Sequence, residues 1–131
     1  MKSMLPSHRE VPYSSLDWRE SQIVPGVRFA IRKISLAQRI NLAEKTRDLF
    51  MQHEFLRAGD SADQVQAALA ELMVRRLYLE WGLAVIEKLT VDGEVATVET
   101  LIERGPEDLT AEIATVIRDS LTLTPEERKN S

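Results

Sequence analysis

The side chains that could do chemistry in this chain are its two histidines, its serines and a group of acidic residues. His53 is followed directly by Glu54, whereas two ligands on one helical face need a spacing of three or four residues. His8 lies far from both in the sequence, and the chain has no cysteine. Because zinc takes several such donors, we predict no metal site and expect both histidines at a surface or an interface.

Acidic residues crowd the sequence between positions 92 and 108, but without the fixed loop spacing of a calcium-binding hand. We therefore assign them to turns and helix ends. The serines fit neither a nucleophile elbow nor a phosphate loop, and no glycine cluster indicates a nucleotide site. The sequence thus predicts no catalytic residue, no cofactor and no enzymatic activity.

The length and the net charge of the chain narrow the possible classes of protein further. A chain of 131 residues has the usual size of one domain. Its net charge is −4 and both signs are interspersed, which argues against nucleic acid as a main partner. The lack of cysteine fits a reducing compartment. No run approaches the roughly 20 apolar residues of a membrane span or the apolar core of an export signal, so we expect a cytoplasmic protein without a membrane anchor.

The longest helical pattern covers residues 60–89 and contains no proline. Apolar residues recur in it at steps of three and four, which predicts one apolar side along a single long helix: Val65, Leu69, Leu72, Met73, Leu77, Trp81, Ala84, Val85 and Leu89. Because such a side must be covered, we expect the other elements to pack along this helix. Trp81 is expected to be buried in that packing.

A second long helix is predicted over residues 35–58, with Ser35 as its N-cap and Gly59 at its end. Its apolar residues form two adjoining sides, one with Leu36, Ile40, Ala43 and Phe50 and the other with Leu42, Leu49 and Leu56. The helix is therefore either the inner member of a small bundle or a helix with a partner-binding side, for which the three leucines at 42, 49 and 56 are the candidates. The short connection at 59–60 predicts an antiparallel hairpin of the two long helices.

Arg75 and Arg76 lie in the middle of the 60–89 helix, with Glu71 and Glu80 nearby. Local ion pairing between these residues is one explanation of the pattern. The alternative is a strip that binds an acidic partner helix, so both arginines join the candidate partner-binding residues.

Strand signals are few. Val27, Phe29 and Ile31 alternate with polar or small residues, which predicts a half-buried strand. A single strand needs a partner, and the segment 88–96, centred on the turn dipeptide Asp92-Gly93, is the best internal candidate. We expect a small β-hairpin or a sheet of two or three strands.

Thr97 is expected to cap a short helix that stops at Gly105-Pro106. Pro106 then suits the start of an amphipathic helix, whose apolar side contains Leu109, Ile113, Val116 and Ile117. Residues 123–131 are expected to form a frayed tail.

Residues 1–21 show no useful periodicity and are predicted to form an arm. Within it, Tyr13 and Trp18 either pin the arm to the helices or contact a partner. Residues 22–131 then form one mainly α domain, with an antiparallel helical hairpin, shorter C-terminal helices and the small β element.

Several segments, in this order, carry a resemblance to a known family. They are 25–29 (PGVRF), 77–83 (LYLEWGL), 91–94 (VDGE) with 96–97 (AT), 101–109 (LIERGPEDL) with 112–113 (EI), and 123–130 (LTPEERKN). Together with the helix that begins at Ser35, they resemble small proteins that tail modules of bacteriophages and prophages encode and that are assigned as tail assembly chaperones. The likeness extends over about residues 24–130.

This resemblance implies a non-enzymatic, mainly helical protein that binds the tape-measure protein, keeps it in solution and helps to recruit tail-tube subunits before leaving the finished particle. It also implies several copies per client, and hence a homo-oligomer in the cytoplasm of the bacterial host. The alternative is a structural virion component, such as a head–tail connector or a tail completion protein, which would stay in the mature particle.

Overall fold

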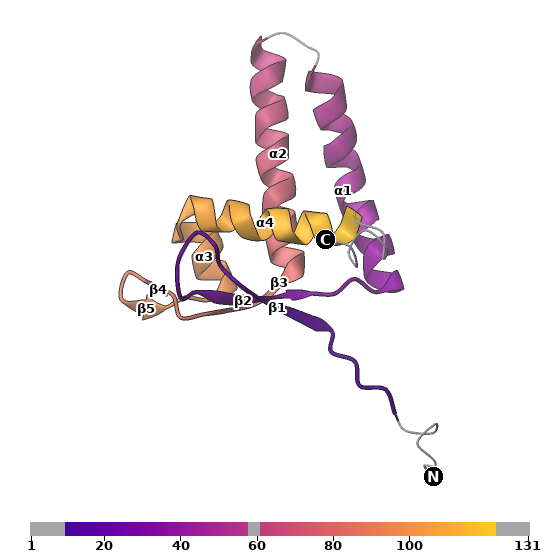
Figure 1. Ribbon diagram of the computed structural model, residues 1–131. Coiled ribbons are helices and arrows are strands. Elements are labelled where there is room, and N and C mark those ends of the chain that lie inside the picture. Colours follow the sequence, from indigo (N-terminus) through magenta and orange to yellow (C-terminus); the bar gives the residue numbers. More distant parts are fainter. Residues whose placement is uncertain (1–9, 58–60, 123–131) are drawn as a thin grey trace.

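The computed structural model describes residues 10–57 and 61–122, without the side chains at 48, 50, 52–57, 61–63 and 122. Along the chain the elements are β1 (Leu16–Glu20), β2 (Arg28–Arg32), α1 (Leu36–Arg57), α2 (Ser61–Gly82), β3 (Leu83–Glu87), β4 (Thr90–Val91), β5 (Glu94–Val95), α3 (Val98–Arg104) and α4 (Glu107–Thr122) (Figure 1). The expected helical hairpin, C-terminal helices and small sheet are therefore present. The strands make the fold a mixed α/β one rather than a purely helical one.

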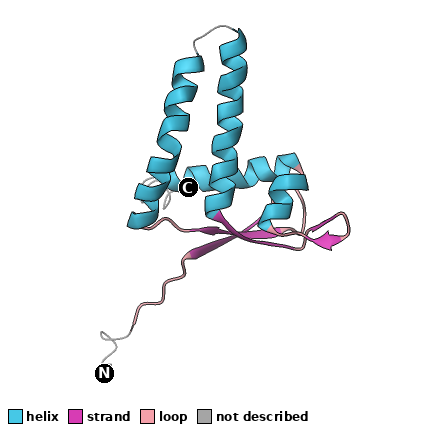
Figure 2. Ribbon diagram, turned by 180° about the vertical axis from the view of Figure 1, so that it is seen from behind, coloured by secondary structure: helices cyan, strands magenta, loops and turns pink. Residues whose placement is uncertain are grey.

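The main sheet has the order β1-β2-β3, and both strand pairs are antiparallel. Ala30 in the central strand lies opposite Trp18 on one side and Val85 on the other. Phe29 and Ile31 point to the opposite face, where each is 1% exposed. Helices α2, α3 and α4 cover that face (Figures 1 and 2).

Strand β1 lies within residues 1–21, for which the sequence predicted an arm without regular structure. It is an edge strand, and Trp18, Arg19 and Glu20 are exposed, so no buried side imposes an apolar alternation on it. The turn after β1 is tied to α4: Ser21 Oγ donates to Glu112 Oε1 at 2.7 Å, and the Gln22 N–H donates to Glu112 Oε2 at 2.6 Å. Part of the predicted arm is thus fixed to the body of the protein.

The helix predicted over 60–89 is wrong in its last part, because α2 ends at Gly82 and the next five residues form β3. A short run of consecutive apolar residues is typical of both a buried helix and a buried strand, so periodicity did not separate the two. β2 also needs a hydrogen-bonding partner at its second edge, and β3 supplies it. A Cβ added at Gly82 would lie 3.0 Å from methyl carbons of Ile117, so the helix end packs closely on α4.

The Asp92-Gly93 turn is confirmed, with positive φ angles of 53° at Asp92 and 83° at Gly93. It joins β4 to β5, which pair only with each other among the described residues. The prediction that this segment would pair with β2 is therefore wrong. The turn is held instead by an ion pair between Arg104 Nη1 of α3 and Asp92 Oδ2, at 2.6 Å.

Helix α3 begins and ends where the sequence predicts. Thr97 caps it by accepting a hydrogen bond from the Thr100 N–H, and the Gly105 N–H donates to Leu101 O at 2.9 Å. Gly105 has an extended φ of −81°, so its role is not a left-handed turn. A Cβ there would lie 2.6 Å from Leu101 O, so glycine is needed because the space is filled. Pro106 precedes α4, and its carbonyl accepts from the Thr110 N–H.

The core lies between the sheet, α3, α4 and the lower end of α2. The predicted apolar side of α4 supplies its centre, because Leu109 and Ile113 are 0% exposed and Ile117 is 1% exposed. The full cluster is Val27, Phe29, Ile31, Leu79, Leu83, Ile86, Val91, Ala96, Leu101, Leu109, Ile113, Ala114 and Ile117. Trp81 is only partly buried at its margin, so the expectation of full burial is wrong.

Helices α1 and α2 form the predicted antiparallel hairpin, which projects from this body (Figures 1 and 2). Ser35 caps α1 by accepting from the Gln38 N–H at 3.2 Å. The predictions for His8, Gly59 and the tail at 123–131 lie outside the described residues, as do those for the side chains of His53, Phe50 and Leu56.

Candidate protein-interaction surfaces

The projecting hairpin leaves apolar side chains uncovered on α1. Leu36, Ile40 and Met51 are 78%, 54% and 65% exposed. Their spacing, with Ala43 and Arg47 between them, places all five on one side of the helix. An open, mainly apolar hollow of about 490 Å³ lies beside Met51 and is lined by Ala43, Glu44, Thr46, Arg47 and Met51. We name this side, defined by Leu36, Ile40 and Met51, the α1 face.

A second uncovered group lies on the upper part of α2. Val65, Leu69, Leu72 and Met73 are 67%, 49%, 47% and 49% exposed. All four belong to the apolar side that the sequence predicted would be covered by other elements. The structure covers a different side of the helix, with Ala67, Ala70 and Val74 buried. We name the exposed group the α2 face.

The predicted partner-binding leucines lie elsewhere. Leu42 is 6% exposed and Thr46 is 4% exposed, and the buried residues of α2 are their counterparts within the hairpin. Leu42 is therefore a packing residue, and its assignment to a partner is wrong because α2 already covers this side of α1. Leu49 is half-buried. The side chain of Leu56 lies outside the described residues.

The two arginines of α2 have different surroundings. Arg76 Nε lies 3.2 Å from Glu80 Oε2, and Arg76 Nη2 lies 3.4 Å from Glu103 Oε2 on α3. These are the local ion pairs that the sequence indicated, and their exposure makes each worth little in stability. Arg75 is half-buried at the junction of α2 and α4.

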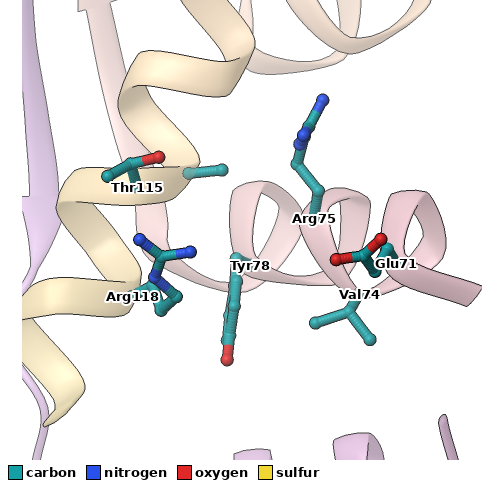
Figure 3. A pocket seen from close by; sticks show the side chains of 7 residues that line it. Glu71, Val74, Arg75, Tyr78, Thr115 and Arg118 are labelled. Carbon is teal, nitrogen blue, oxygen red and sulfur yellow. The ribbon is translucent and has the colours of Figure 1, made fainter. Parts of the chain in front are cut away.

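That junction holds a small cavity of about 190 Å³, lined by Glu71, Val74, Arg75, Tyr78, Ala114, Thr115 and Arg118. Figure 3 shows these lining side chains, with Arg118 and Thr115 on α4 and Arg75, Tyr78 and Glu71 on α2. Burial raises the pKa of the Tyr78 phenol above its ordinary value of 10.0, and the positive charge of Arg118 opposes this with a smaller lowering. The cavity is partly open to solvent, since Glu71, Thr115 and Arg118 are exposed, and it is small for a ligand site.

We expect Tyr78 to report on folding at alkaline pH. Its raised folded-state pKa means that the folded protein holds the phenolic proton more tightly than the unfolded chain. The stabilising contribution is therefore complete below about pH 10 and is lost as the pH rises through the folded-state pKa. The variant Tyr13→Phe leaves Tyr78 as the only tyrosine, since the chain has two.

An ultraviolet absorbance titration of Tyr13→Phe should give a higher midpoint in the folded protein than in concentrated urea. The further change Tyr78→Phe should remove this contribution to the alkaline loss of stability. Equal midpoints in the folded and unfolded states would contradict the burial of the phenol.

The described residues contain no group of side chains that could bind a metal ion. Within 10–57 and 61–122, no three histidine or acidic side chains are grouped so that they could hold an ion. In the same part of the chain, every buried side-chain nitrogen and oxygen has a hydrogen-bond partner. None of the described helices is long and apolar enough to cross a membrane. The two apolar faces of the hairpin are the candidate interaction surfaces.

Comparison with known proteins identified no family for this chain. No protein-family model matches the chain, and neither the curated proteins nor the solved structures gave a match.

The α1 and α2 faces were only partly visible in the sequence. Their residues are apolar and follow helical spacing, but no pattern in the sequence indicates which side of each helix is covered. Leu36 and Ile40 belong to one of the two apolar sides predicted for this helix, Met51 to neither, and Leu42, which is buried, belongs to the side proposed for a partner. The composition of both sides is apolar, so hydrophobic periodicity alone could not rank them.

Proposed function

We propose that this protein is a tail assembly chaperone of a bacteriophage or prophage, which binds the tape-measure protein non-enzymatically and keeps it in solution. Two observations support the proposal. The first is the resemblance of its sequence segments to such chaperones. The second, which carries the argument, is the exposed α1 face on a hairpin that projects from a well-packed body.

The α1 face has the form of a helix-binding site. Leu36, Ile40 and Met51 are more than half exposed, along a line that also holds Ala43. The small side chain at 43 lets a partner helix approach closely between the larger ones, and the hollow beside Met51 gives room for an apolar anchor. Glu44 and Arg47 border the hollow and provide a polar rim of both signs.

A tape-measure protein is a long helical client with apolar faces that aggregate until the tail tube encloses them. Coverage by several chaperone copies along such a rod gives avidity without a tight individual site. In this proposal the host cytoplasm is the site of action, and tail-tube subunits are recruited to the same complex. Release of the chaperone then leaves the client free to enter the tube.

The test is co-expression with the tape-measure protein encoded in the same tail module. Wild-type chaperone should raise the soluble fraction of that protein and co-purify with it. The double variant Leu36→Glu and Ile40→Glu should reduce co-purification at least about tenfold, since loss of two apolar contacts amounts to more than 1.4 kcal/mol of binding free energy. Its own melting curve should stay close to wild type because both side chains are exposed.

Val95→Glu is the matched control, because Val95 is 77% exposed but lies on β5, away from the hairpin. It should retain client binding. An unchanged solubility of the tape-measure protein in the presence of wild-type chaperone would refute the proposal. Recovery of the protein in purified mature particles would instead favour a head–tail connector or a tail completion protein.

A further inference from the structure

We propose that two copies of this chain associate through the α2 face, with their α2 helices antiparallel across a twofold axis near Leu69. The occupant of this face is thus a second copy of the chain. The inference goes beyond the proposed function, since it concerns a different helix from the α1 face and holds for any client.

The first step is the spacing of the α2 face. Val65, Leu69 and Leu72 follow steps of four and three, and the same line continues through Arg76 to Leu79. This is the repeat of a helix whose seam is covered by another helix. Met73 widens the seam at its lower end, where its side chain is 49% exposed.

The second step is that the chain already buries the lower end of this line. Leu79 is 3% exposed and belongs to the core, whereas Leu69 and Leu72, two or three turns above it, are about half exposed. Leu72 borders a hollow of about 350 Å³ that Leu79 and Ile102 of α3 also line. The α2 face is therefore the continuation of a buried seam beyond the point where α3 ends.

The third step is the size of the exposed surface. Four side chains that are half to two-thirds exposed present on the order of 300 Å² of apolar surface, as large as the main patch of a typical monomer. Self-pairing would bury it twice. The apolar part of the interface would then be about 600 Å², half of the roughly 1,200 Å² at which stable interfaces begin, and flanking side chains would have to supply the rest.

The fourth step is charge. The outward neighbours of the seam in its upper part are Gln64, Gln66 and Ala68, which are uncharged. Arg75 and Arg76 lie at the lower end only, so a parallel pair would bring the arginines of both copies together. An antiparallel pair keeps them at opposite ends. Glu71 does not interfere, because it lines the cavity on the α4 side of the helix.

The register follows from these positions. With Leu69 on the twofold axis, Val65 of one copy lies opposite Met73 of the other, so apolar residues meet apolar residues along the seam. Such an isologous contact is self-complementary and closes at two subunits. The hairpin that carries this face projects from the body (Figure 1).

Sedimentation equilibrium of the full chain tests the association. The wild type should be a dimer at about 100 μM. Leu69→Glu should raise the dissociation constant of the dimer at least tenfold and leave the melting curve of the monomer unchanged. The matched control is Leu36→Glu, an equal change on the α1 face, which should leave the dimer intact. A wild type that stays monomeric up to about 1 mM would overturn the inference, as would a dimer that survives Leu69→Glu.

Cysteine cross-linking tests the orientation, because the natural chain has no cysteine. Leu69→Cys should form a disulfide-linked dimer under mild oxidation. Val65→Cys alone should not, since its two copies would lie ~12 Å apart along the helix axis, beyond disulfide reach. A mixture of Val65→Cys and Met73→Cys should give the mixed cross-link.

Efficient cross-linking of Val65→Cys with itself would show a parallel pair and overturn the antiparallel arrangement. Failure of this proposal is separable from failure of the proposed function. A wild-type protein that is monomeric but binds the tape-measure protein would reject only the α2 pairing. A wild-type dimer that does not solubilise the tape-measure protein would reject only the proposed function.

Discussion

Replacement of Ile113 by alanine is expected to lower the free energy of unfolding by about 3–5 kcal/mol. Ile113 is 0% exposed in the middle of α4, and its neighbours in the core come from the sheet, α3 and α2. The substitution removes buried apolar surface and leaves a cavity among elements that cannot all close around it. Urea denaturation followed by circular dichroism measures the effect.

Val95→Ala serves as the comparison, because Val95 is 77% exposed and its truncation should change stability by less than about 0.5 kcal/mol. Trp81→Ala should lower the free energy of unfolding by less than truncation of a fully buried aromatic residue would, since Trp81 lies at the margin of the core. A loss below about 1 kcal/mol for Ile113→Ala would mean that α4 does not pack on the sheet as described.

Replacement of Leu42 by glutamate is the second change with a large expected effect. Leu42 is 6% exposed inside the hairpin, so a carboxylate there would be buried without a partner or would force α1 away from α2. We expect a loss of about 3–5 kcal/mol, the range for an uncompensated buried charge. The thermal melting curve, followed by the helical circular dichroism signal, should shift to a much lower temperature.

Leu36→Glu separates this effect from any general intolerance of the helix to glutamate. Leu36 lies on the same helix but is 78% exposed, so its substitution should change stability little. If Leu42→Glu proved as harmless as Leu36→Glu, the hairpin would not be packed through Leu42, and Leu42 would be a candidate for partner binding.

The elements that the sequence predicted correctly are those with signals in neighbouring residues. Ser35 caps α1, Thr97 caps α3, and Asp92-Gly93 adopts the positive φ angles of its turn. In each case a side chain or a backbone preference acts within a few residues, so the pattern is sufficient by itself. The apolar side of α4 was also predicted: Leu109, Ile113 and Ile117 are buried, and Val116 is partly buried against the core.

The strands at both edges of the sheet were missed for a different reason. β1 and β3 exist because β2 offers hydrogen-bonding groups to either side, and β2 lies many residues from β3 in the sequence. The segment at 83–87 carries residues that suit a helix or a strand equally. Its conformation is decided by the partner it meets.

By itself, the sequence determined where most helices begin, which turns the chain can make, and that apolar side chains line both long helices. Only the tertiary structure decided which of those side chains are covered. Leu42 became interior and Leu69 stayed exposed because coverage depends on an element that arrives from elsewhere in the chain, and α3 and α4 end below the upper part of the hairpin. Hydrophobic periodicity describes a helix alone, whereas burial is a property of the helix and its neighbour together.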